Sequence, residues 1–128
     1  MIDHTKVPNT DQINFPLLFN TTDPSLATTA NNGHVQNPNG YDIFFSTDPT
    51  GQTKLDYEME QYNPVTGQVI AWIRIPTLSH TTDTVVYMFY GNSAITTSQR
   101  NPTGVWDASY SGFGIYRTAR PFLRMIRL

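Results

Sequence analysis

The sequence predicts an all-β domain, an antiparallel β-sandwich that is jelly-roll-like. Tyr and Phe each occur seven times in the 128 residues, and nine Pro and eight Gly divide the chain into short segments. Several of these segments alternate apolar and polar residues, with turn residues between them at spacings of roughly 8–12 residues. Aromatic residues favour strands and Gly and Pro favour turns, so the composition indicates strands rather than helices.

The first expected strands cover residues 2–7 and 13–19, with a turn at residues 8–11. Pro16 lacks the N–H that a sheet ladder needs, so we expect its strand to lie at a sheet edge or to be bulged. Residues 20–40 are rich in Asn, Thr, Asp, Gly and Pro and predict a long surface loop. A short strand at residues 41–46 and a turn at residues 47–52 follow.

Residues 54–76 carry the clearest pattern, which predicts a β-hairpin. Both halves alternate with a period of two, and the sequence Asn-Pro-Val-Thr-Gly at residues 63–67 is typical of a turn. Residues 84–90 form an almost continuous apolar run, which predicts a central strand buried on both faces. We expect this hairpin and this strand to form the centre of the sandwich.

Charge and composition exclude several classes of function. All ten acidic residues lie before residue 117, whereas four of the eight basic residues are Arg117, Arg120, Arg124 and Arg127. The acidic body has little attraction for nucleic acid. There is no Cys, which excludes disulfides and thiolate chemistry. No stretch has the roughly 18 apolar residues of a membrane span, and residues 1–4 do not begin a signal peptide.

The chain contains an ordered series of sequence blocks. They are Ile-Asp-His-Thr-Lys-Val (2–7), Asn-Phe-Pro (14–16), Asp-Ile-Phe-Phe (42–45), Lys-Leu-Asp-Tyr-Glu-Met-Glu (54–60), Ala-Trp-Ile-Arg-Ile-Pro (71–76), Tyr-Gly-Asn (90–92) and Val-Trp-Asp-Ala (105–108). This series resembles the prokaryotic domain-of-unknown-function family numbered 2341, over about residues 2–112. The resemblance implies an extracellular or cell-surface β-sandwich module that often precedes a laminin-G or concanavalin-like domain, and it brings no catalytic residues.

The two ends of the chain depart from this family, so we divide it into a module at residues 1–112 and a tail at residues 113–128. Family members tend to continue with Val-Trp-His-Leu, whereas this chain reads Gly-Phe-Gly-Ile-Tyr at residues 112–116. Codons for that segment, read from their third base, can encode Val-Trp-His-Leu. We therefore expect the tail to be frameshifted. A shortened first strand would leave an open sheet edge, through which copies of the chain could pair.

The hairpin supplies the candidate catalytic residues. Alternate residues of a strand share a face and lie roughly 6.5–7 Å apart, so Asp56, Glu58 and Glu60 are expected in one row. That spacing suits the paired carboxyl groups of a glycosidase, and the Asp-x-Glu-x-Glu pattern is similar to the Glu-x-Asp-x-Glu strand of laminarinase-like jelly-roll enzymes. The alternative is a solvated face of the sheet without catalytic function.

The second strand of the hairpin supplies candidate ligand-binding residues. Trp72 and Arg74 are expected beside Glu58 and Glu60, and Tyr62 ends the first strand. An aromatic ring next to charged groups suits sugar recognition, because the ring stacks on apolar sugar faces and the charges bind hydroxyls. The alternative is that Arg74 pairs with a cross-strand acid while Trp72 packs under a loop.

Metal sites are less strongly indicated. No cofactor is implied, although Asp42 and Asp48, with Asp56, flank a Gly-containing turn and could bind calcium through oxygen atoms. The three His residues are far apart in sequence and have no zinc-ligand spacing.

Three functions remain open from the sequence. The first is an exported module that binds an oligosaccharide or polysaccharide, or that packs against a carbohydrate-binding neighbour. The second is a small glycoside hydrolase using Asp56, Glu58 and Glu60, and the third is a structural spacer.

Overall fold

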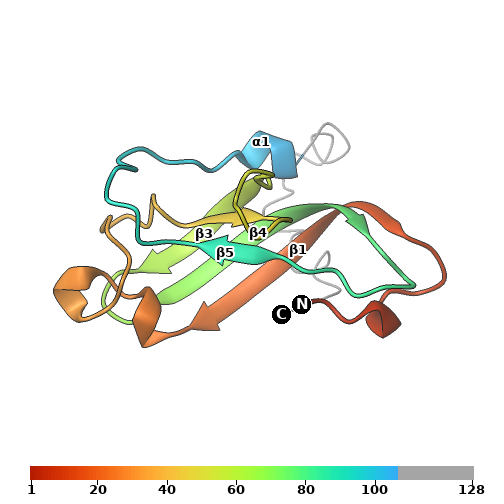
Figure 1. Cartoon of the computed structure of the whole chain (residues 1–128), viewed down its shortest axis with the longest axis horizontal. Coiled ribbons are helices and arrows are strands. Elements are labelled where there is room, and N and C mark those ends of the chain that lie inside the picture. The colour runs from red at the N-terminus through yellow and green to blue at the C-terminus, as the bar shows by residue number, and fades with distance from the viewer. Residues whose placement is uncertain (107–128) are drawn as a thin grey trace.

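The computed structural model describes residues 1–106, which fold as two antiparallel sheets (Figure 1). The predicted tail at residues 113–128 lies outside the described residues. The larger sheet has the order β1-β4-β3, and the smaller one pairs β2 with β5. The strands are β1 (Gln12–Thr22), β2 (Phe44–Ser46), β3 (Tyr57–Asn63), β4 (Gln68–Leu78) and β5 (Tyr87–Phe89).

Short helical segments complete the described fold. Three single 3-10 turns occur at His4–Lys6, Pro24–Leu26 and Thr29–Asn31, and one α-helical turn, α1, covers Pro102–Val105. No helix within residues 1–106 has the length and apolar character that crossing a membrane requires. The all-β, sandwich-like fold predicted from the sequence is therefore confirmed.

The predicted hairpin is the β3–β4 pair. The Asn63 side chain accepts hydrogen bonds from the backbone of Val65 (2.9 Å) and Thr66 (3.1 Å), and Gly67 closes the turn with φ of +72°. This positive φ explains why Gly stands there. The register shifts between Met59 and Gln61, so one residue of β3 is a β-bulge.

β1 pairs with the other side of β4 and forms an edge of the larger sheet. Pro16 lies opposite Arg74 in this register. Its position on an edge strand confirms the sequence-based expectation, because only an edge strand has a side on which a missing N–H costs nothing.

Two expectations about strands were wrong. Residues 84–90 do not form a central strand, since β5 belongs to the two-stranded sheet and Tyr87 is 36% exposed. Val86 and Met88 pack against the core while Val85 and Tyr87 face outward, so the apolar run is an alternating one. Residues 2–7 are not a strand either, apart from a bridge between Ile2 and Thr84.

The start of the chain turns because of a local side-chain bond. The Asp3 carboxylate accepts hydrogen bonds from the backbone N (2.9 Å) and the hydroxyl (2.7 Å) of Thr5. Such a bond offers the backbone an alternative to a sheet ladder. It caps the 3-10 turn His4–Lys6, which replaces the expected strand.

The larger sheet is covered on both faces. The main core lies between the two sheets, and its largest fully buried side chains include Phe45, Leu17, Ile73 and Ile75. A second cluster on the opposite face joins Leu18 and Trp72 to Val105 and Trp106. Successive residues of a strand point to opposite faces, which is why Trp72 and Ile73 belong to different clusters. In Figure 1, α1 lies beside β3 and β4, where it covers this second face.

Candidate functional site

The three predicted carboxylates do not form one row. Asp56 forms an ion pair with Arg74 (Oδ2 to Nη2, 2.7 Å) and accepts a hydrogen bond from the Asn101 side chain (2.9 Å). Burial opposes the charged form of Asp56, but these hydrogen bonds outweigh it and hold the pKa below its usual value. Arg74 also donates to the Asn14 side chain (2.8 Å). Asp56 and Arg74 therefore hold β4 against neighbouring segments.

Glu58 is buried beneath α1. Its register partner on β4 is Trp72, as the sequence predicts, and its carboxyl group accepts a hydrogen bond from Nε1 of Trp106 (2.5 Å). The rings of Trp72 and Trp106 make a T-shaped contact with centroids 5.3 Å apart. Trp72 is only 4% exposed, so its faces are occupied by protein. Trp72 is thus covered by the segment around α1, which is close to the alternative interpretation that it packs under a loop.

Glu60 has a different environment because of the β-bulge. The register passes from Met59 opposite Ala71 to Gln61 opposite Ile70, which makes Glu60 the extra residue of β3. A bulge re-aims side chains and locally breaks the alternation of faces. Glu60 is exposed, and it lies on a surface groove that neither Asp56 nor Glu58 lines.

This groove, which we call the β3 groove, has a volume of about 290 Å³. It lies between β3, the loop before β2, and the loop that leads to α1. A smaller inner pocket of about 50 Å³ shares four lining residues with it: Asn39, Tyr41, Met59 and Arg100. The inner pocket is further lined by Gly40, Tyr57 and Ser98, and the β3 groove by Pro38, Glu60, Gln61 and Tyr62.

Two tyrosines form part of the walls, and their hydroxyl groups point inward. Tyr57 donates to the backbone oxygen of Ile43 (2.7 Å), and Tyr62 donates to that of Leu26 (2.8 Å). Burial raises the pKa of each phenol to about 12, with the Asp42 charge adding to the effect at Tyr62. Both phenols are therefore neutral near pH 7 and serve as fixed walls rather than as proton donors in chemistry.

The loop before β2 is fixed by a buried carboxylate. Asp42 accepts hydrogen bonds from the backbone N–H groups of Gln36 (2.9 Å), Asn37 (3.0 Å) and Gly91 (2.8 Å). A carboxylate that accepts several N–H bonds ties the segments that donate them together. Asp42 thus holds the loop that carries Asn39 and Tyr41.

Asp42 and Asp48, the calcium ligands suggested by the sequence, form hydrogen bonds with different partners. Asp48 accepts hydrogen bonds from the side chain of Thr50 and from backbone N–H groups including that of Thr53 (2.6 Å). These hydrogen bonds hold the pKa of Asp48 below its usual value, with the largest effect from the Thr50 hydroxyl and the next from the Thr53 N–H. Within residues 1–106, neither Asp42 nor Asp48 joins a group of three possible metal ligands.

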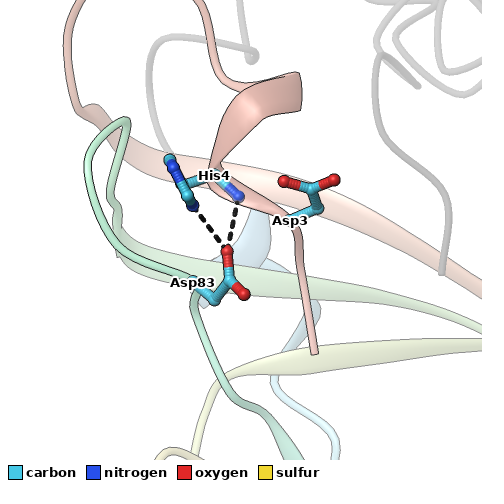
Figure 2. A group of neighbouring side chains, drawn as sticks. All are labelled: Asp3, His4 and Asp83. Atoms are coloured by element: carbon cyan, nitrogen blue, oxygen red, sulfur yellow. Dashed lines mark hydrogen bonds and ion pairs between the residues drawn. The ribbon is translucent and has the colours of Figure 1, made fainter.

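Such a group does occur elsewhere, among Asp3, His4 and Asp83, whose ligand atoms lie within 4.8 Å of one another. Figure 2 shows that the His4 ring and backbone N both bond one oxygen of Asp83, at 2.7 and 3.0 Å. His80 bonds Asp11 in the same way, at 2.6 and 3.0 Å. The two pairs fasten the first residues to the loop after β4. Asp83 is distant from His4 in sequence, which is why ligand spacing could not reveal the group.

Sequence reasoning found Glu60 and Tyr62 but missed Tyr41 and Arg100. Tyr41 begins the strand predicted at residues 41–46, but the structure starts β2 only at Phe44 and leaves Tyr41 in the preceding loop. Arg100 stands in a segment with no periodic pattern. No local signal marks such residues, because only the folding of three separate segments places them on one groove.

Comparison with known proteins places the chain in a family. A family model described as a domain of unknown function, DUF2341, matches residues 39–116, more than half of the chain, and that span includes Tyr41, Glu60 and Arg100. No curated protein and no solved structure matches the chain. The chain belongs to the DUF2341 family of domains of unknown function.

Proposed function

We propose that this domain is a non-catalytic carbohydrate-binding module and that the β3 groove holds the saccharide. The observation that carries the proposal is the lining of this groove: the half-buried Tyr41 beside amide and charged groups from Asn39, Glu60, Gln61 and Arg100. Saccharides are recognised by aromatic rings that pack on their C–H faces and by polar groups that bond their hydroxyls.

The groove replaces the site expected around Trp72. Trp72 is buried and Arg74 is engaged with Asp56 and Asn14, so neither offers a surface for a sugar. Of the predicted ligand-binding residues, Tyr62 alone lines the groove, together with Glu60 from the carboxylate row. The inward hydrogen bond of Tyr62 fixes its ring, which lowers the entropy lost on binding.

Binding is favoured over hydrolysis by the positions of the carboxyl groups. A glycosidase needs two of them, about 5–9.5 Å apart and facing one substrate bond. Asp56 and Glu58 are committed to Arg74 and Trp106, and within residues 1–106 Glu60 is the one acid that lines the groove. The family resemblance implies an extracellular or cell-surface protein, so the ligand we expect is a polysaccharide outside the cell.

A glycan array, followed by calorimetry on each positive glycan, tests the proposal. We expect Tyr41→Ala and Glu60→Gln each to weaken binding about tenfold or more. Tyr87→Ala is the matched control, since this exposed tyrosine lies on β5 and does not line the groove. Binding equally lost in the control, or no binding to any glycan, contradicts the proposal. Turnover of chromogenic glycosides that disappears in Glu60→Gln would support the hydrolase instead.

A further inference from the structure

Among the described residues, Arg100 is the basic residue that lines the groove. It lines both the β3 groove and the inner pocket, whereas Glu60 lines the β3 groove alone. Among the residues that the structure describes, the inner pocket is therefore lined by a basic residue and by no acidic one, whereas the outer part of the groove is lined by both Arg100 and Glu60.

The other basic groups in residues 1–106 have different surroundings. Arg74 is bound to Asp56 and Asn14, and Lys54 donates to Gln99 (2.7 Å) while lying 4.4 Å from the centre of the Phe44 ring. Lys6 lies in the 3-10 turn near Asp3. The Arg100 guanidinium makes no hydrogen bond or ion pair with any group in residues 1–106.

The charge of Arg100 also acts at the inner pocket. Burial raises the pKa of Tyr57, and the Arg100 charge partly offsets that rise. Since Tyr57 forms part of the inner pocket wall, the guanidinium is close enough to bias groups inside that pocket. A pocket of about 50 Å³ accommodates a group of the size of a carboxylate but not a pyranose ring.

These positions determine what the groove selects. A guanidinium group binds a carboxylate through two parallel hydrogen bonds, a geometry that a neutral hydroxymethyl group cannot reproduce. We propose that the β3 groove recognises an acidic saccharide of the uronic acid class, with the uronate carboxylate at Arg100 in the inner pocket and the sugar ring beside Tyr41. The hydroxyl groups then face Glu60 and Gln61. This inference rests on the proposed carbohydrate-binding function.

The test compares matched ligands by calorimetry: oligogalacturonate, the same oligomer with its carboxylates methyl-esterified, and a neutral oligosaccharide of equal length. We expect the acidic oligomer to bind at least tenfold more tightly than its ester. Arg100→Gln is expected to remove that preference, because it should lower affinity for the acidic oligomer at least tenfold more than affinity for the ester or for the neutral oligomer. Lys6→Gln, which removes the same charge outside the groove, is expected to change neither.

The outcomes separate this inference from the proposed function. If neutral glycans bind at the groove and the acidic oligomer has no advantage, the inference is overturned and the binding function stands. If the preference for acid survives in Arg100→Gln or disappears in Lys6→Gln, Arg100 is not the recognising group. If no glycan of either kind binds, both proposals are overturned.

Discussion

Trp106 Nε1 donates a hydrogen bond to the carboxyl group of Glu58 at 2.5 Å, and both residues are buried. This bond joins the segment after α1 to β3 and brings the Trp106 ring against Trp72. An acid that the sequence marks as a candidate catalyst is therefore part of the packing that covers the outer face of the larger sheet.

We expect Trp106→Phe to lower the free energy of unfolding by about 1–3 kcal/mol, because it keeps a ring against Trp72 but removes the donor to a buried carboxyl group. Glu58→Gln and the double variant complete a mutant cycle by urea denaturation, with an expected coupling of about 1–2 kcal/mol. If the effects of the two substitutions on the free energy of unfolding simply add, the hydrogen bond between Trp106 and Glu58 does not contribute to stability.

The ion pair of Asp56 with Arg74 predicts a dependence of stability on pH. Its folded-state pKa lies below the ordinary value of 3.8, so its contribution is present above that pH and is lost as pH falls through the folded-state pKa. Asp56→Asn should cost about 1–2 kcal/mol at pH 7. The difference from wild type should shrink below pH 4.

Urea unfolding at a series of pH values measures this effect. Arg74→Gln serves as the companion variant, because loss of its charge and hydrogen bond returns the pKa of Asp56 toward the ordinary value. A cost of Asp56→Asn that is the same at pH 7 and pH 3 would show that the ion pair does not carry the effect.

Gly67 allows the tight turn of the hairpin. Its φ is +72°, and an added Cβ would overlap the backbone oxygen of Asp23. We expect Gly67→Ala to destabilise the domain by about 2–4 kcal/mol, through backbone strain and steric overlap together. Gly91→Ala is the control: its φ is +92°, but the nearest atom is 3.4 Å away. Thermal or urea unfolding should show that Gly91→Ala lowers the free energy of unfolding by about 1 kcal/mol. Equal losses of stability in the two variants would contradict the steric overlap at Gly67.

Asp42 links stability to the proposed site. Asn at this position keeps the shape but replaces one accepting oxygen by an NH₂ group, so at least one of three backbone bonds is lost. We expect Asp42→Asn to cost about 2–3 kcal/mol and to weaken glycan binding, because its loop carries Asn39 and Tyr41. Asp48→Asn loosens a turn that does not line the groove and should leave affinity unchanged. Equal affinities in both variants would contradict the link.

The hairpin could be predicted because its signals are local. Alternation over residues 54–62 and 68–76 and a Gly that adopts positive φ are properties of neighbouring residues, as is the missing N–H of Pro16. The same reasoning predicted that Glu58 lies beside Trp72, and the strand register confirms it. It failed at Glu60, because a β-bulge depends on how two strands fit together rather than on the alternation of one.

The amino-acid sequence by itself therefore determined the all-β class, the hairpin and the family, which depend on local backbone preferences and on a series of motifs. The tertiary structure alone decided which side chains are accessible. Trp106 and α1 cover Trp72 and Glu58, and three segments distant in sequence create the groove beside Glu60. The physical reason is that burial and charge pairing are set by contacts between distant segments, and their free energy does not appear in the pattern of any one strand.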